Sequence, residues 1–335
     1  MGSITHAARG RRSGRAGSRA GVGLVVALGA ALSFGMSGAW ARGLIDAGWT
    51  PGAAVTARIW LGALVLLVPA AYALRGQWGL LRRNAGMIVA YGLLAVTATQ
   101  LCYFQAVAVM DVGIALLIEY TAPAAVVLWL WLRRGERPTR RSILGAVVAF
   151  AGLVLMLDVL TGARVDAGGI LWALAAMIGA ATYFVLSARE DTGLPPIVLA
   201  AAGLLLGAVG LTLAGLVGVL PMAWSFEDVA YRFGPIPRML VPWFVPVLAI
   251  GVLACALAYV LGVASTRMLG SRLASFVALA EVVAALLFGW LLLGQLPAPV
   301  QLLGGALVLA GVVIVKLGEP AAVTELVEPL PDPPR

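Results

Sequence analysis

Long apolar segments recur along almost the whole chain, and they restrict its possible folds more than any other feature. A helix needs about 20 predominantly apolar residues to cross the roughly 30 Å of hydrocarbon in a bilayer. Ten segments of about this length are present: Val22–Ala41, Pro51–Ala73, Gly86–Val107, Val112–Leu132, Ser142–Leu157, Gly168–Ser187, Leu194–Leu220, Val241–Val263, Arg272–Leu293 and Pro297–Leu317. Since a barrel would instead show alternating strands of about ten residues, these segments predict ten transmembrane helices.

The composition agrees with an all-α integral membrane protein. Hydrophobic residues make up 62% of the 335 residues and charged residues only 11%, with a mean hydropathy of +1.01. A soluble domain is nearer half apolar and a quarter charged. The net charge of +8 is typical of arginine-rich loops that bind lipid headgroups, so we expect no nucleic-acid binding. Two cysteines in apolar runs and a single histidine predict no disulfide framework, no metal site and no cofactor.

The distribution of arginine and lysine predicts the orientation in the membrane. With the N-terminus inside, seventeen of these residues fall on the inner side and four on the outer side. This bias follows the positive-inside rule, and ten spans place both termini in the cytoplasm of a bacterial-type inner (plasma) membrane. Residues 1–20 then form a basic cytoplasmic tail, and residues 318–335 form an acidic, proline-rich tail that we expect to be disordered.

The first apolar segment has a second interpretation. The basic stretch "RGRRSGRAGSRA", the apolar run and "AWA" together resemble a secretory signal with a cleavage site. The apolar run is long for such a signal, and nine more segments follow it, so we predict a retained helix. For the next segment, Thr50 followed by Pro51 predicts a helix N-terminus, with a capping side chain and a proline in the first turn.

The chain contains an internal repeat. "APAAVVLWLWLRRGERPTRRSILGAVVAFAGLVLM" (122–156) aligns with "EVVAALLFGWLLLGQLPAPVQLLGGALVLAGVVIV" (281–315) at an offset of 159, which matches Gly145 with Gly304 and Gly152 with Gly311. Upstream, Tyr103 matches Tyr259 at a smaller offset. The repeats, 21–158 and 168–317, hold five expected helices each. Because five is odd, the second copy is inverted, an architecture of secondary transporters with a binding site between the copies.

These features resemble a known family. Two repeats that close in "P..A..L..WL..GE.P......G" form resemble the EamA-type transporters of the drug/metabolite transporter superfamily, over residues 20–317. The stretches "GIALLIEYTAPAAVV" and "ARIWLGALVLL" are similar to the threonine/homoserine exporter branch. The second copy departs from the pattern, because Val282 replaces a proline and Gln295 replaces the closing glutamate. The resemblance implies a multipass carrier of small polar metabolites, often an exporter.

A carboxylate interrupts the apolar stretch "GIALLIEYTAP" (113–123). At 1.5 Å per residue, Glu119 lies about 10 Å into its segment, Glu281 about 13 Å, and Arg58 about 10 Å. A charge at this depth costs about 2.5–3.5 kcal/mol on insertion scales, and such residues usually face the bundle interior or a wet cavity. In the repeat, Glu119 aligns with Ala278, almost one turn before Glu281, so the two carboxylates are expected to point inward from equivalent faces.

Pro123 adds a backbone feature at the same level. It has no N–H to donate to the carbonyl of Glu119, so we expect a helix kink there. We predict that Glu119 and Tyr120 border a midplane pocket in which Glu119 meets a substrate ammonium or carries a coupling proton. Arg58 either pairs with Glu119 or meets a substrate carboxylate. Further pocket candidates are Gln100, Tyr103, Tyr183, Tyr259 and Glu281.

Simpler roles for the same residues are alternatives. Glu119 and Glu281 are also compatible with structural carboxylates that are hydrogen-bonded between helices. Arg58 is compatible with a side chain that extends to the outer interface, and the tyrosines with packing or interfacial anchoring. The matched glycines indicate close helix packing and no binding role.

The sequence predicts a transporter and no enzyme. It has no phosphate-binding Walker loop, and the outer loop 221–240 has few polar groups, so we expect it to form a short amphipathic helix over the outer mouth. The predicted function is alternating-access transport, and most simply export, of small polar metabolites such as amino acids. Expected partners are the substrate, the lipid bilayer, protons as coupling ions and a second copy in a homodimer. The alternatives are a broad-specificity drug exporter and, from another class, a membrane enzyme or a non-transporting assembly protein.

Overall fold

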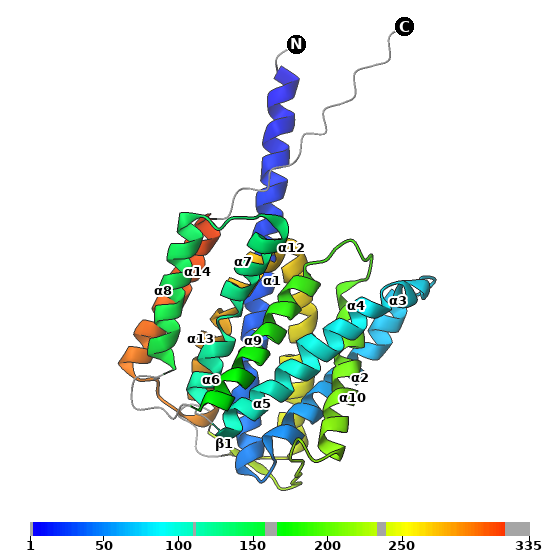
Figure 1. Cartoon of the computed structure of the whole chain (residues 1–335), viewed down its shortest axis with the longest axis vertical. Helices are drawn as coiled ribbons and strands as arrows, with labels where there is room; N and C mark the ends of the chain where they lie inside the picture. The colour runs from blue at the N-terminus through cyan, green and yellow to red at the C-terminus, as the bar shows by residue number, and fades with distance from the viewer. Residues whose placement is uncertain (1–2, 110–111, 158–165, 233–238, 319–335) are drawn as a thin grey trace.

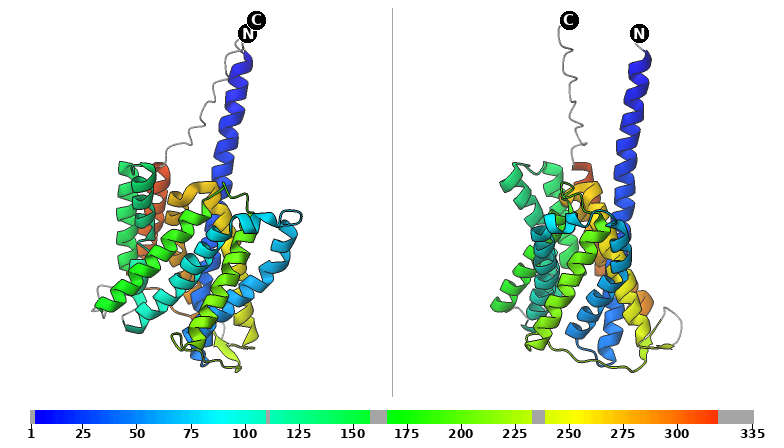
Figure 2. Two further views of the ribbon diagram at one scale, coloured as in Figure 1. Left: turned by 45° about the vertical axis from the view of Figure 1, so that its right-hand side comes forward. Right: turned by 90° about the vertical axis from the view of Figure 1, so that its right-hand side faces the viewer.

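The protein is a bundle of helices that run roughly along its long axis. A computed structural model describes residues 3–109, 112–157, 166–232 and 239–318. Figure 1 and the two side views in Figure 2 show helix α1 leaving one end of the bundle, while a short β-hairpin lies at the opposite end. The predicted disordered tail lies outside the described residues, apart from Gly318 at the end of the last helix.

The first half of the chain contains eight α-helices, the first of which begins in the basic tail, and one π-helix. In chain order these are α1 (Ser3–Asp46), α2 (Pro51–Ala73), α3 (Gly79–Arg83), α4 (Ala85–Ala90), the π-helix η1 (Tyr91–Ala98), α5 (Thr99–Val109), α6 (Val112–Glu119), α7 (Ala122–Arg134) and α8 (Arg140–Met156). The predicted start of α2 is confirmed, because the Thr50 hydroxyl accepts a hydrogen bond from the Ala53 N–H at 3.3 Å and Pro51 is the first helical residue.

The second half repeats this arrangement with an added hairpin. Its elements are α9 (Ala167–Ser187), α10 (Pro196–Leu216), β1 (Val229–Tyr231), β2 (Met239–Val241), α11 (Phe244–Leu248), the π-helix η2 (Ala249–Leu257), α12 (Ala258–Ala278), α13 (Ala280–Leu293) and α14 (Pro299–Gly318). The two strands pair antiparallel, with Val229 opposite Val241. The expectation of an amphipathic helix over the outer mouth is therefore wrong for the described part of that loop.

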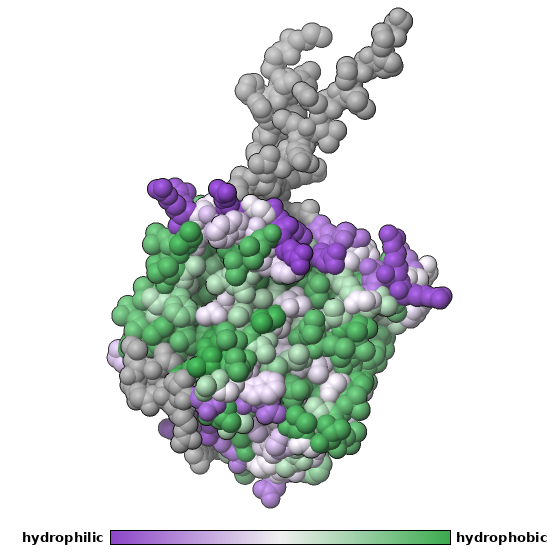
Figure 3. All heavy atoms as spheres, in the orientation of Figure 1, coloured by the Kyte–Doolittle hydropathy of each residue, from purple (hydrophilic) through white to green (hydrophobic). Residues whose placement is uncertain are grey.

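The outer face of the bundle suits a lipid environment. Within the described residues, eight helical segments are long and apolar enough to cross a membrane: Gly21–Asp46, Pro51–Ala73, Ala85–Val109, Ile114–Arg134, Ala167–Ser187, Pro196–Leu216, Phe244–Ala278 and Pro299–Gly318. Figure 3 shows hydrophobic residues across the middle of one face of the molecule and hydrophilic residues toward the two ends of that face. The chain is therefore a multipass membrane protein.

The helices differ from the ten expected segments in three places. The expected helix 112–132 is two helices, α6 and α7. At the expected boundary between the eighth and ninth segments, the backbone leaves the helical conformation at Gly270, whose φ of 80° and ψ of 160° favour glycine, so two helices meet there at a kink with no loop between them. Arg267 lies on the helix before this kink and Arg272 on the helix after it. The segment α13 has only 14 residues, or about 21 Å of helix.

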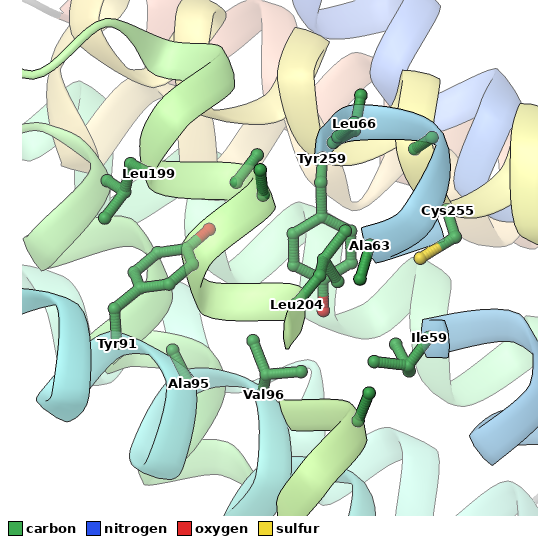
Figure 4. Packing of buried hydrophobic residues seen from close by; sticks show 14 of the residues in the cluster. Ile59, Ala63, Leu66, Tyr91, Ala95, Val96, Leu199, Leu204, Cys255 and Tyr259 are labelled. Carbon is green, nitrogen blue, oxygen red and sulfur yellow. The ribbon is translucent and has the colours of Figure 1, made fainter. Parts of the chain in front are cut away.

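The interior packs most tightly where small residues let helices approach. Figure 4 shows Ile59 and Ala63 of α2 in one cluster with Val96 of η1, Leu204 of α10 and Tyr259 of α12. All five side chains are 4% exposed or less. This cluster joins helices from both halves of the chain, so the halves share one apolar core.

The backbone boundaries of the two halves recur at the offset found in the sequence. The helices α5 and α12 begin at Thr99 and Ala258, each directly after a π-helical segment. Likewise, α7 and α13 end before Gly135 and Gly294, which have left-handed φ values of 70° and 66°. Each of these pairs is 159 residues apart. The smaller offset inferred from the tyrosines at 103 and 259 is therefore not followed by the backbone.

The matched glycines form a reciprocal contact between α8 and α14, which lie side by side in Figures 1 and 2. A Cβ added to Gly145 would lie 2.6 Å from the carbonyl oxygen of Gly311, and one added to Gly152 would lie 2.6 Å from that of Gly304. Gly304 is the repeat counterpart of Gly145, and Gly152 is the repeat counterpart of Gly311, so the two contacts are equivalent in the repeat. The predicted close packing at these glycines is confirmed, and no side chain fits between the two backbones.

This contact generates a stability prediction. Gly145→Ala should force α8 and α14 apart and lower the free energy of unfolding by about 1–3 kcal/mol, as overpacking does in other cores. Gly86→Ala on α4 is the control, because nothing lies within 4 Å of its added Cβ and alanine favours helix. Thermal unfolding of both purified variants in one mild detergent measures the difference, and equal midpoints would contradict the packing argument.

Candidate functional site

Helices from both halves of the chain line a cavity of about 220 Å³ that contains charged side chains. Its wall is built from α1, α2, η1, α5, α6, α7, α9, α12 and α13. All eight residues predicted for substrate binding line it, namely Arg58, Gln100, Tyr103, Glu119, Tyr120, Tyr183, Tyr259 and Glu281, together with Pro123. The structure thus brings together side chains that are up to 223 positions apart in the sequence.

A helix break carries Glu119 into the cavity. Helix α6 ends at Glu119 and α7 begins at Ala122. The hydrogen bonds around the break use the carbonyls of Leu116, Ile118 and Thr121, and Pro123, in the first turn of α7, has no N–H to offer the carbonyl of Glu119. At the expected kink, the helix is therefore interrupted by a turn of two residues, Tyr120 and Thr121, which is tolerated at membrane depth where backbone lines a cavity.

A second break carries Glu281 to the same cavity. Helix α12 ends at Ala278 and α13 starts at Ala280, so Glu281 lies in the first turn of α13. A carboxylate is stabilised there by the partial positive charge of the helix N-terminus. Ala278 is the repeat counterpart of Glu119, so the two breaks occupy equivalent places in the two halves.

The two carboxylates have different surroundings. Tyr120 lies within hydrogen-bonding reach of Glu281. Glu119 is close enough to Glu281 and Arg58 to interact electrostatically with both. Arg58 is also close enough to interact with Glu281, so both carboxylates share the basic side chain and the cavity, and only Glu281 has the tyrosine beside it.

Arg58 contributes a cation that is held by α1. Its Nη1 donates a hydrogen bond to the Ser37 hydroxyl at 2.7 Å, while its Nε is buried and has no hydrogen-bond partner. Four ion pairs occur among the described residues, and none of them joins Arg58 to a carboxylate. Of the two expected roles, the direct pair with Glu119 is therefore not formed among the described residues.

Aromatic rings form one side of the cavity. Tyr259 packs edge-on against Phe34, with ring centroids 5.3 Å apart, and against Tyr183 at 5.7 Å. Tyr183 packs in turn against Phe184 at 5.0 Å. Because these edge-to-face contacts hold the rings in place, the aromatic side of the cavity is rigid and largely apolar.

Several cavity residues escaped prediction because each lies in an ordinary apolar run. They include Phe34, Phe184, Ser265, Thr266 and Ser275. One signal was available in α12, whose sequence contains four serine and threonine residues within eleven positions, 265–275. Among the described residues, no group of three or more His, Cys, Asp or Glu side chains could hold a metal ion.

A multipass helical protein whose two halves share a charged cavity has the arrangement of a membrane transporter. Residues 21–158 and 167–317 each match the profile of the EamA-like transporter family. The chain belongs to the EamA-like transporter family. The superfamily expectation is thereby confirmed.

Relatives outside the profile agree with this assignment. The chain is 27% identical over 214 residues to the "Uncharacterized transporter YwfM" of Bacillus subtilis (strain 168), which covers 64% of this chain and 67% of that protein. A solved structure described as "Crystal structure of protein" superposes with a TM-score of 0.68 at 22% identity, over 89% of this chain and 97% of the other. The second likeness concerns the fold alone.

The cavity generates a labelling prediction. In a protein with Cys102 and Cys255 replaced by alanine, a cysteine at Ala180, which lines the cavity, should react with a small cationic methanethiosulfonate at least ten times faster than one at Ile178. Ile178 lies on the same helix but is 61% exposed on its outer side, where lipid suppresses thiolate formation. Equal rates in lipid vesicles would contradict a hydrated cavity.

Proposed function

We propose that this chain is a secondary transporter that carries small zwitterionic metabolites such as amino acids across the bacterial inner membrane. The observation that supports this most directly is the presence of both charge signs in one cavity. Arg58, which forms no ion pair among the described residues, borders this space for a substrate carboxylate, and Glu119 and Glu281 border it for a substrate ammonium. A zwitterionic ligand can pair with a cavity charge of each sign, whereas a purely cationic or purely anionic ligand can pair with only one sign.

The size of the cavity favours a metabolite over the alternative of a broad drug exporter. Pockets for drug-sized ligands occupy about 300–1,000 Å³, whereas this cavity measures about 220 Å³. An assembly protein without transport activity predicts a closed core, and a cavity with three charged side chains argues against it. No positive feature favours a membrane enzyme.

The transport mechanism in this proposal is alternating access by two inverted five-helix repeats. This mechanism requires ten spans. The stretch Phe244–Ala278 is divided at Gly270, its last part forms one span together with α13, and α8 is counted as a further span. The reciprocal glycine contact between α8 and α14 supports this pseudo-symmetry, as do the helix breaks at matching positions. Rocking of the repeats around the cavity would expose it to each side in turn.

Direction, orientation and coupling complete the proposal. Export with both termini in the cytoplasm follows from the arginine distribution and from the resemblance to exporters. Glu119 is the candidate for proton coupling, since it lacks the tyrosine partner that Glu281 has, and a carboxylate that exchanges a proton for a substrate needs no other cofactor. A homodimer is compatible with the exposed apolar faces.

Transport assays in reconstituted vesicles test the proposal. Purified protein should move at least one radiolabelled amino acid from a panel of neutral, acidic and basic members, and an imposed pH gradient should alter the rate. If no member of the panel is transported under either condition, the substrate class is wrong.

Glu119→Gln provides the residue-level prediction. Removing the charge that meets the ammonium should lower transport at least tenfold and abolish its dependence on the pH gradient. Glu227→Gln, two residues before β1 and outside the cavity, is the matched control and should behave like the unchanged protein. Normal rates with normal pH dependence in Glu119→Gln would remove Glu119 from the mechanism.

A further inference from the structure

The helices around the cavity form two groups, each of which combines both halves of the chain. Helix α1 packs against η2, α12 and α13, whereas α9 packs against η1, α5, α6 and α7. We call these sets the α1 group and the α9 group, and both contribute residues to the cavity wall. Opening of the cavity toward one side of the membrane therefore requires the two groups to separate at that end of the bundle.

An ion pair joins the two groups at the N-terminal end of the bundle, where α1 leaves it (Figure 1). Nη2 of Arg272 on α12 lies 3.2 Å from Oε2 of Glu136 and 3.4 Å from the carbonyl oxygen of the same residue. Glu136 follows the end of α7, so the pair connects the α1 group to the α9 group. The Arg272 side chain is 8% exposed and the Glu136 side chain 46%, so salt screens this pair less than a fully exposed one.

Two glycines with left-handed φ values set the backbone on either side of this pair. Gly135, with a φ of 70°, ends α7, and Glu136 donates its N–H to the carbonyl of Leu130 at 3.3 Å. Gly270, with a φ of 80°, forms the kink two residues before Arg272. Because other residues are strained at these φ values, the directions of both segments are determined locally, and the ion pair then joins them.

The second half of the chain repeats this backbone turn without its charge. At the offset of 159 residues, Gly294 corresponds to Gly135 and has a φ of 66°. Gln295 donates its N–H to the carbonyl of Gly289 at 3.2 Å, the counterpart of the bond that Glu136 makes. The two backbones match, so the difference between them lies in the side chain, which is a neutral amide in the second half.

This second turn lies at the opposite end of the bundle, beside the β-hairpin. Arg232, the residue after β1, donates its N–H to the carbonyl of Leu292, near the end of α13, at 2.9 Å. The position that corresponds to Arg272 is occupied by Gly113, which has no side chain. The repeat therefore supplies neither the carboxylate nor the guanidinium at the hairpin end.

We infer that the Glu136–Arg272 ion pair is a latch that holds the α1 and α9 groups together at the N-terminal end, and that the matching positions at the hairpin end form no such latch. The cavity consequently opens more readily toward the hairpin end, whereas opening toward the N-terminal end requires the pair to break. This inference rests on the proposed function, under which the latched end faces the cytoplasm. It makes the two repeats unequal and favours a resting state that is closed to the cytoplasm.

Sided labelling of a cavity cysteine tests the latch without a substrate. In protein with Cys102 and Cys255 replaced by alanine, a cysteine at Ala180, which lines the cavity, is treated with a membrane-impermeant cationic methanethiosulfonate in right-side-out and in inside-out vesicles. Glu136→Gln, which introduces the residue of the second half, should raise the ratio of N-terminal-side to hairpin-side labelling about threefold to fivefold, since a partly exposed ion pair corresponds to a factor of up to this size. An unchanged ratio overturns the inference.

Variants of the neighbouring arginines separate the latch from a local effect of charge. Arg272→Gln, and the double variant with Glu136→Gln, should change the ratio by the same factor as Glu136→Gln alone, because the two partners of one pair are not additive. Arg134→Gln should leave the ratio unchanged, although Nη1 of Arg134 lies 4.0 Å from Glu136, since Arg134 belongs to α7 and so to the same group. Additive effects contradict the latch. If the Arg272 variants do not fold, the comparison of Glu136→Gln with Arg134→Gln decides.

An ion pair within a single loop serves as the matched control. Nη2 of Arg189 lies 3.6 Å from Oδ2 of Asp191, and both residues belong to the loop after α9. Asp191→Asn should keep the labelling ratio of the unchanged protein, and a change as large as that of Glu136→Gln contradicts a specific latch. If the Ala180 cysteine reacts from one side only in every variant, alternating access and the latch both fail; if it reacts from both sides with a ratio that Glu136→Gln does not alter, only this inference fails.

Discussion

The need to accommodate charge inside an apolar bundle governs the rest of the structure. Arg58, Glu119 and Glu281 all lie in segments that are otherwise apolar enough for a bilayer. Each charge at membrane depth costs about 2.5–3.5 kcal/mol unless it faces water or a partner. The fold meets this requirement by directing all three charges into one cavity, where both signs are present and a hydrated ligand can enter.

The broken helices and the closely packed helices have complementary roles. Breaks after Glu119 and after Ala278 place polar side chains and free backbone groups around the cavity. In contrast, α8 and α14 approach through glycines until their backbones touch, which produces a rigid unit at the periphery. A transporter needs both properties, because a site with adaptable walls must move relative to helices that keep their shape.

Membership of the EamA-like family and the fold do not define the substrate, since one fold hosts many functions. The substrate class has to be inferred from the charges and the volume of the cavity, and both depend on side chains from several helices of the two halves.

The sequence by itself determined the membrane class, the internal repeat, the α2 cap and the residues of the charged site, because hydropathy, periodicity and buried charge are local properties. It could not determine that a short turn separates α6 from α7, that the helices on either side of Gly270 meet at a kink and not at a loop, or that Arg58 bonds Ser37 and not a carboxylate. Those outcomes depend on contacts between distant helices. Gly262 and Phe34 show the same limit, since neither has a distinctive local pattern and only the approach of α1, α9 and α12 makes them part of the cavity.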